Sequence, residues 1–443
     1  MVDQPQEAKK SRTSVELFAG GGGLAMAVHQ AGFRPLLFNE FNKRACETLV
    51  ASATKTLGVD GLVSIEDVCP KPPRRGEPAP LYPGDVRDLD LTRLQGKVDV
   101  LAGGPPCQPF SAGGVAKGDE DKRNMFPAMF KAVRDIRPKA VICENVRGLL
   151  RPSFAEYFQY ILNELQLPFE KRDDDTRWQD HNAHLTGILG KLSEDDSDWD
   201  HYKVVMVPVN AADYGVPQVR NRVVIVAFRA DLGVDMEAFE KYVKTPRFSE
   251  AALFRSMRDD DGSYWNRHDA PDHVRSRVQA RLPRIIKEDD CQPWRTLRDA
   301  IAGNGKDLPK LPPVDLNRLH EKFDFGKAID VVDHVGWPGA RIYKGHTPNE
   351  LDRPAKTVKA GVHGVPGGES VMLTDELDPA DGMNYRHRYM TVRETARVMT
   401  FPDEWLGSGP RGEQMRQLGN AVPVVLGEFF AEAVADALLA AGH

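Results

Sequence analysis

The sequence is poor in cysteine, has no long apolar run and carries no excess of positive charge. Its five cysteines, Cys46, Cys69, Cys107, Cys143 and Cys291, form no C-x-x-C pair. Their spacing argues against a disulfide framework and against a zinc or other metal site, and it indicates a reducing cytoplasm. No apolar run approaches the roughly 20 residues that a membrane helix needs, so no membrane partner is expected. The polar first residues, MVDQPQEAKKSR, are typical of a loose tail and not of a secretory signal.

The formal net charge of −6 does not indicate a nucleic-acid-binding protein. If the partner is nevertheless a nucleic acid, positive charge must be concentrated on one face of the molecule. The stretch Arg275–Lys287 (RSRVQARLPRIIK) is such a concentration, although a solvated helix face explains it equally well.

The first half of the chain alternates short apolar runs with helical patterns. The runs expected to form strands are Val15–Gly20, Arg34–Glu40, Asp99–Gly104 and Ala140–Asn145, followed later by Tyr202–Val209 and Arg222–Phe228. Helical patterns cover 24–31 and 43–53 between the first of these runs. Alternating strands and helices predict an α/β fold with an open twisted, Rossmann-like sheet, in which ligands bind beyond the carboxyl ends of the strands.

Composition divides the chain into four parts. Residues 1–12 form a tail, and residues 13–231 a first domain with a charged surface insertion at about 170–200. Residues 232–413 are expected to form a second, smaller and irregular domain, because the strand–helix rhythm fades and Pro, Gly and charge increase. Residues 414–443 end in an amphipathic helix over Gly427–Gly442 and are expected to return to the first domain.

A glycine loop, Gly20–Gly23, follows the first strand and opens a helix. Glycines there allow a cofactor to approach the backbone, and the helix amino terminus favours an anionic group. Glu40, at the end of the next strand, is placed to accept hydrogen bonds from ribose hydroxyls. The loop also satisfies a loose dinucleotide fingerprint, so by itself it leaves the choice of cofactor open and admits an NAD-dependent oxidoreductase.

Two residues at strand ends are candidates for chemistry. Cys107 lies in GGPPCQPFS, where prolines and glycines fix the backbone and present the thiol beyond the sheet edge. A thiolate is the reactive form of cysteine, and we expect the other four cysteines to be buried and inert. Glu144, in ICENV, ends a strand parallel to the one before Cys107. The two side chains are therefore expected to meet over one substrate ring.

Six motifs in order resemble those of the cytosine-5 DNA methyltransferase family of the prokaryotic restriction–modification type. They are FAGGGG, PPCQPFS, ENV, QVRNR (Gln218–Arg222), RETARVMTFPD (Arg393–Asp403) and GNAVP (Gly419–Pro423). The resemblance covers Val15–Phe228 and about 389–439, and RPAKTVKAG (Arg353–Gly361) resembles the end of the family's target-recognition segment. It implies that the sheet is that of an S-adenosylmethionine-dependent methyltransferase and that the second domain recognises the DNA target.

The resemblance also implies the role of each site residue. Cys107 would add to carbon 6 of a flipped-out cytosine, Glu144 would stabilise a proton on ring nitrogen 3, Arg222 would hold the base oxygen and orient Glu144, and Arg220 would contact the DNA backbone. S-adenosylmethionine, which yields S-adenosylhomocysteine, would be held by Phe18, Gly20, Gly22, Glu40, Asp85, Val86, Pro105, Asn420 and Val422. Gln108, Ser111 and Arg123 would contact DNA within a closing lid over 111–124, although Asn124 stands where the family often has glycine.

The leading hypothesis is therefore a monomeric DNA cytosine-5 methyltransferase acting on double-stranded DNA, with a cognate restriction endonuclease as a separate protein. An RNA (tRNA) methyltransferase of the same fold is the first alternative, because fold alone does not select the acceptor. The large segment at 245–385, sized to read a major groove, speaks against it. A DNA-binding protein without catalysis is a weaker alternative because Cys107, Glu144 and Arg222 are all present.

Overall fold

A computed structural model describes residues 12–57, 59, 61–106, 124–192, 200–258, 263–303, 308–317, 319, 331–360, 370–380 and 382–443. The chain divides into two compact units. Unit 1 comprises Met1–Val209, Asn221–Thr245 and Gly427–His443, and unit 2 comprises Asn210–Arg220 and Pro246–Leu426. Among the described residues, no helix combines the length and the apolar character needed to cross a bilayer.

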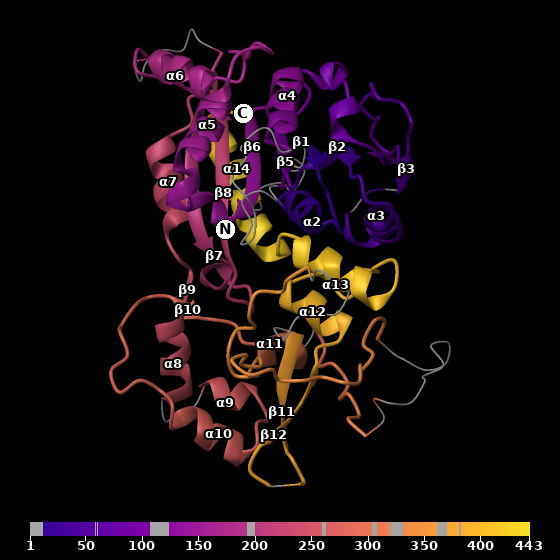
Figure 1. Ribbon diagram of the computed structural model, residues 1–443, viewed down its shortest axis with the longest axis vertical. Coiled ribbons are helices and arrows are strands. Elements are labelled where there is room, and N and C mark those ends of the chain that lie inside the picture. The colour runs from indigo at the N-terminus through magenta and orange to yellow at the C-terminus, as the bar shows by residue number, and fades with distance from the viewer. Residues whose placement is uncertain are drawn as a thin grey trace, which may run out of the picture. The chain divides into compact units, whose positions relative to one another are not determined.

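Unit 1 is built on an eight-stranded sheet (Figure 1). Its strands are β1 (Thr13–Leu17), β2 (Arg34–Asn39), β3 (Leu62–Ser64), β4 (Ala79–Tyr82), β5 (Val100–Gly103), β6 (Ala140–Val146), β7 (Tyr202–Asn210) and β8 (Asn221–Arg229). They lie in the order β3-β4-β2-β1-β5-β6-β8-β7. The pairs from β3 to β6 are parallel, and β8 runs antiparallel to β6. The predicted α/β fold is confirmed.

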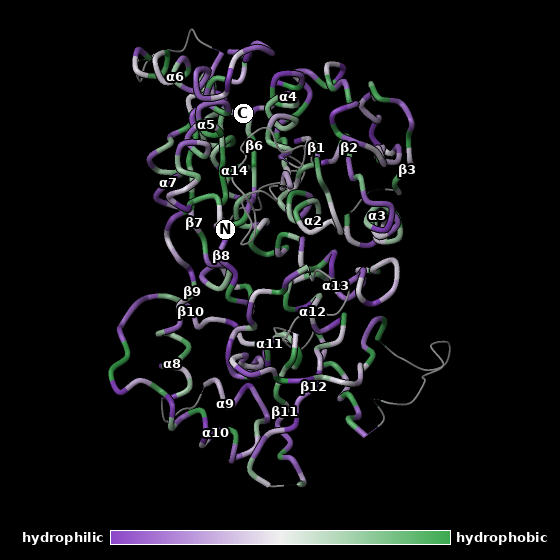
Figure 2. The backbone as a smooth tube through the Cα atoms, viewed as in Figure 1, coloured by the Kyte–Doolittle hydropathy of each residue, from purple (hydrophilic) through white to green (hydrophobic). Residues whose placement is uncertain are grey.

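Helices cover the sheet of unit 1, and three of them match the helical patterns expected over 24–31, 43–53 and Gly427–Gly442. They are α2 (Gly23–Gln30), α3 (Lys43–Thr56), α4 (Phe126–Ile136), α5 (Ala155–Gln166), α6 (Trp178–Leu189), α7 (Met236–Lys244) and α14 (Val424–Ala440, in unit 1 from Gly427). Figure 2 shows apolar residues concentrated along the strands and on the helix faces toward them. Val15 and Leu17 of β1 share one apolar core with Phe130 of α4 and Ile161 of α5. Burial of this core is the main stabilising contribution to unit 1.

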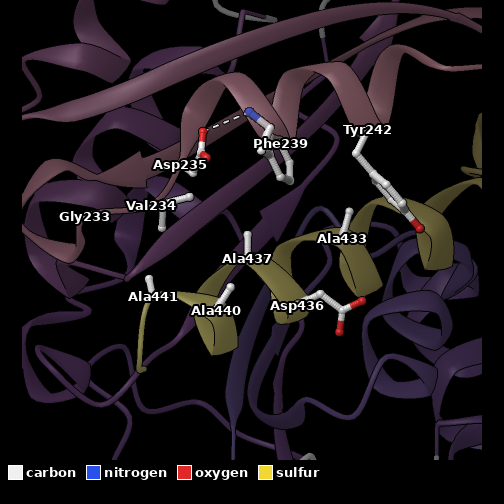
Figure 3. Close-up of a pocket in the computed structure, with 11 residues that line it drawn as sticks. Gly233, Val234, Asp235, Phe239, Tyr242, Ala433, Asp436, Ala437, Ala440 and Ala441 are labelled. Atoms are coloured by element: carbon white, nitrogen blue, oxygen red, sulfur yellow. Dashed lines mark hydrogen bonds between the residues drawn. The ribbon is translucent and has the colours of Figure 1, made fainter.

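The end of the chain returns to the beginning of unit 1. The Arg12 guanidinium, just before β1, donates a hydrogen bond of 2.8 Å to the main-chain oxygen of His443. Helix α14 runs beside α7, and the rings of Tyr242 and Phe429 stack with centroids 5.6 Å apart. An apolar cavity of about 300 Å³ lies between these two helices, lined largely by alanines of α14 (Figure 3). Asp235 caps α7 at its edge, accepting from the Ala238 N–H at 2.9 Å.

The segment at 170–200 differs from its expected form. It was expected to be a charged surface insertion of little periodicity, but it contains α6, whose Leu185 and His181 are buried. The residues of α6 that pack inward, Trp178, His181 and Leu185, are spaced three or four apart. Because they are few and stand among charged and polar residues, the helical period is hard to see in the sequence. Within the described part of this segment, Trp178–Leu189 therefore forms a helix that packs on α5.

Unit 2 holds short elements joined by long connections. Its helices are α8 (Glu250–Arg258), α9 (Ser263–Arg267), α10 (Asp272–Gln279), α11 (Leu297–Ala302), α12 (Val392–Val398) and α13 (Arg411–Asn420), and its strands are β9 (Phe248–Ser249), β10 (Gln292–Pro293), β11 (Val371–Leu377) and β12 (Tyr385–Tyr389). Buried ion pairs tie these pieces together. Arg298 donates to both Asp352 and Asp375. Replacement of one partner in such a pair leaves an uncompensated buried charge.

Candidate active site

The expected site residues of unit 1 meet at one edge of the sheet. Strands β4, β2, β1, β5 and β6 are parallel neighbours, so their carboxyl ends lie along the same edge. The chain leaves this edge at Phe18 after β1, at Glu40 after β2, at Asp85 beyond β4 and at Gly104 after β5, while Glu144 lies near the end of β6. This is the position at which open α/β sheets bind ligands.

The glycine loop after β1 adopts a backbone that only glycine accepts easily. Gly20 has φ 55° and Gly22 has φ 93°, both in the left-handed region. A Cβ on Gly22 would also lie 3.2 Å from Leu49 Cδ2. The Glu40 carboxylate fixes this loop, because its two oxygens accept from the Gly20 N–H and the Asn42 N–H at 2.7 Å each. The loop and Glu40 therefore form one rigid cradle.

Asp85 lies at the start of a short 3-10 turn, next to the buried Val86. Its carboxylate accepts from the Arg87 main-chain N–H at 3.0 Å and from the Arg87 guanidinium. The hydrogen bonds from Arg87 hold the pKa of Asp85 below its usual range. Asp85 is thus an anionic acceptor at the edge, and the neighbouring Arg87 partly neutralises it.

Glu144 and Arg222 form a largely buried ion pair. Glu144 is opposite Val224 in the β6–β8 ladder, so Arg222, two residues away on β8, projects from the same face. Arg222 Nε lies 2.9 Å from Glu144 Oε1, with 13% and 10% of the two side chains exposed. The geometry is that of an ion pair and not of a hydrogen bond, because Oε1 accepts no hydrogen bond from the described residues. The Glu144 carboxyl therefore keeps acceptor sites open.

The residues that follow β5, Gly104–Pro106, lie beside the Glu144 carboxyl. A Cβ added to Gly104 would lie 3.8 Å from Glu144 Oε2, in ordinary van der Waals contact, so Gly104 lies directly beside this carboxyl. Asn145, to which the sequence analysis gave no separate role, donates from Nδ2 to the Pro105 main-chain oxygen at 2.9 Å. Pro105 is buried and Pro106 is exposed. Cys107, Gln108, Ser111 and Arg123 lie outside the described residues.

The four cysteines that the structure describes are free thiols. Burial raises the pKa of Cys46 and of Cys143 to about 12. Cys69 and Cys291 are half-buried, which corrects the expectation that all four are buried. Desolvation still raises the pKa of both, so none of the four is a ready thiolate.

Arg220 lies in unit 2, where three of the recognised motifs meet. The sequence predicted that it contacts the DNA backbone. In the structure its guanidinium is 1% exposed and donates to the main-chain oxygens of Val358 (2.9 Å), Gly419 (2.9 Å) and Ala421 (2.8 Å). A Cβ on Gly419 would lie 2.4 Å from the Ala360 nitrogen. The two chain segments therefore approach each other so closely that only glycine fits at residue 419.

Comparison with known proteins identifies the family. The model of the C-5 cytosine-specific DNA methylases matches residues 79–167 and 177–436.

The chain belongs to this family of C-5 cytosine-specific DNA methylases.

Two relatives of this methylase match nearly all of it. The Type II methyltransferase M.PspPI of Psychrobacter sp. (strain TA137) is 29% identical, with 98% of this chain and 82% of the relative covered. The Type II methyltransferase M.Eco47II of Escherichia coli is 28% identical, with 95% and 79% covered. A solved structure from E. coli, named as a prophage-encoded DNA modification methyltransferase, has a TM-score of 0.52 and 16% identity over 97% of this chain and 100% of its own. At that identity the likeness concerns the fold alone.

Two residues expected to bind cofactor lie in unit 2 of the methylase. Asn420 is the last residue of α13 and is exposed, and Val422 is buried two residues later. The other expected cofactor residues belong to unit 1.

The basic stretch of unit 2 is partly used within the fold. Arg277 lies over the Tyr385 ring at 3.9 Å from the centroid, and Arg281 pairs with Glu350 at 3.2 Å. Arg284 and Lys287 are exposed. The solvated-face interpretation therefore explains part of the stretch, and the exposed cations are available to a polyanion.

Proposed function

We propose that this methylase is an S-adenosylmethionine-dependent enzyme of the type II restriction–modification kind, with Cys107 as its nucleophile. The observation that carries the proposal is the buried Glu144–Arg222 pair at the sheet edge, facing Gly104, three residues before Cys107. The names of the two relatives support the type II assignment. The family model names DNA and cytosine, so the alternative of a tRNA acceptor is not favoured.

The residues at the edge fit S-adenosylmethionine. Glu40 uses one acceptor site of each oxygen on main-chain N–H groups and retains others for ribose hydroxyls. A Cβ on Gly20 would meet only the Phe18 oxygen, at 4.0 Å, so the loop is open on its outer side. Asp85 supplies an acceptor for the adenine amino group, with Phe18, Gly22, Val86 and Pro105 as the apolar and main-chain surface.

Cys107 and Glu144 would act on different atoms of the cytosine ring. Carbon 5 of cytosine is a poor nucleophile, and thiolate addition of Cys107 at carbon 6 converts it into an enamine carbon. Glu144 shares a proton with ring nitrogen 3, so that negative charge does not accumulate during addition. Arg222 holds the Glu144 carboxyl in place and would contact the base oxygen. Loss of the carbon 5 proton to a base then allows Cys107 to leave by elimination.

When bound, S-adenosylmethionine supplies the electrophilic methyl group, and S-adenosylhomocysteine remains. The target cytosine must leave the duplex to reach this edge, because carbon 6 is inaccessible in stacked DNA. Gln108, Ser111 and Arg123 would contact DNA around the extruded base. Unit 2 would read the target sequence, with Arg284 and Lys287 among its cations for phosphate contacts. We place the enzyme in the cytoplasm with the nucleoid, as a monomer, with any cognate endonuclease separate.

A methyl-transfer assay tests the proposal. Tritium from labelled cofactor should reach carbon 5 of cytosine in duplex DNA, and tRNA should accept none. Cys107→Ser should abolish transfer while duplex binding is retained, and Cys291→Ser, a change of a half-buried thiol in unit 2, should leave transfer intact. Label on adenine, or full activity of the Cys107→Ser variant, would refute the assignment. Bisulfite mapping of DNA from expressing cells then gives the modified site.

A further inference from the structure

The residues that flank the segment 107–123 on its two sides are hydrogen-bonded to each other. The Met125 N–H, just after the segment, donates to the main-chain oxygen of Pro106, just before it, at 3.2 Å. Asn145 holds the adjacent Pro105 oxygen at 2.9 Å. We call residues 105–106 and 124–126 the stem. Because Cys107 follows Pro106 directly, the position of the stem sets the point from which Cys107 starts.

Asn124 fastens the second half of the stem. Its side chain is buried, Oδ1 accepts from the Phe126 N–H at 3.3 Å, and Nδ2 donates to the hydroxyl of Tyr157. Tyr157 belongs to α5 and is 4% exposed. A glycine at residue 124 would make neither contact. This chain therefore ties its stem to α5 by a side-chain hydrogen bond.

Helix α6 packs against Tyr157. The Trp178 ring meets the Tyr157 ring edge-on, with centroids 5.0 Å apart and an interplanar angle of 89°. Asn163 of α5 donates to Asn182 (2.8 Å) and Thr186 (3.1 Å) of α6, so the two helices are also joined by polar contacts. The family model leaves residues 168–176, just before α6, unmatched. The unmatched residues 168–176 lie between α5, which carries Tyr157, and α6, which carries Trp178.

We propose that Tyr157, held by Trp178, is a positioning residue for the nucleophile. It touches no substrate, and it acts through Asn124 on the stem that carries Cys107. The inference rests on the proposed role of Cys107. Fixing the stem before the reaction preserves the attack geometry, and a misplacement of about 1 Å can cost up to about a hundredfold in rate.

The experiment uses the full-length enzyme and a duplex in which the target cytosine is 5-fluorocytosine. S-adenosylmethionine is supplied in excess. Once carbon 5 is methylated, fluorine stands where the proton would be lost, so elimination of Cys107 is blocked and the covalent adduct accumulates. Tyr157→Phe and Asn124→Gly each remove the same hydrogen bond, and each should slow adduct formation about tenfold, the loss expected for about one such bond. The double variant should be no slower than either single variant. Duplex Kd should change by less than about twofold.

Tyr160→Phe is the matched control. Tyr160 lies on the same helix in the same ring cluster, and its hydroxyl donates to Glu164 at 2.6 Å, away from the stem. This variant should unfold at a lower temperature but form the adduct at the wild-type rate. Trp178→Leu should slow the adduct as Tyr157→Phe does.

Three results would overturn the inference. A wild-type adduct rate in both Tyr157→Phe and Asn124→Gly would show that the Asn124–Tyr157 hydrogen bond does not position Cys107. If Tyr157→Phe fails to fold, the rate of Asn124→Gly alone decides the question. Equal slowing in Tyr160→Phe would mean a general loosening of unit 1. The absence of any adduct in the wild type would instead refute Cys107 as nucleophile, and this inference with it.

Discussion

Arg220 provides a sharp test of whether a motif residue acts on DNA or on the fold. Its guanidinium is buried and satisfies three main-chain oxygens of unit 2, those of Val358, Gly419 and Ala421. Arg220→Ala would leave these oxygens without their donor. An unsatisfied buried acceptor costs about 1–3 kcal/mol, and partial access of water reduces the sum. We expect a loss of roughly 3–5 kcal/mol in the free energy of unfolding.

A loss of this size lowers the melting temperature of a unit of about 200 residues by roughly 10 °C. Thermal unfolding by circular dichroism measures it, and Arg177→Ala, a change of an exposed side chain of unit 1, serves as the comparison. The decisive second measurement is the salt dependence of duplex binding below the melting transition. If Arg220 serves the fold, the slope of log K against log salt is unchanged. A slope reduced by about one, with normal stability, would show a phosphate contact and refute the reasoning.

Three further changes follow from the same geometry. Glu144→Gln should lower methyl transfer in the tritium assay at least about a hundredfold, because the amide forms no ion pair with Arg222 and shares no proton with the base; a normal rate would remove Glu144 from the mechanism. Glu40→Gln should weaken cofactor binding by calorimetry about tenfold without changing duplex Kd, because one amide oxygen cannot accept from both Gly20 and Asn42; equal losses for both ligands would contradict this. Burial raises the pKa of Glu16 to about 8. Between the ordinary carboxyl pKa and about 8, the unfolded chain releases a proton that the folded chain keeps, so stability falls as pH rises. Glu16→Gln should remove that fall and stabilise the protein by roughly 2–4 kcal/mol at about pH 9 in denaturant titrations, and an unchanged pH dependence would contradict it.

The family and the main sheet were predictable from the sequence because both depend on local patterns. Apolar runs ending in glycine or polar residues predicted β1, β2, β5 and β6 to within three residues at each end. The parallel order of these strands placed Glu40 and Glu144 at one edge without further information. Helix α6 was missed because its buried face consists of few residues within a charged segment.

What the sequence determined was which residue types follow which strands: the glycine loop, Glu40, Cys107 and Glu144. Tertiary structure decided how they are partnered. Arg222 reaches Glu144 across the β6–β8 ladder, Arg220 is buried among carbonyls up to about 200 residues away, and Tyr157 reaches Asn124 from another helix. The physical reason is that a strand end depends on neighbouring residues, whereas the partner of a buried polar group depends on which distant segments the packed core brings within hydrogen-bond distance.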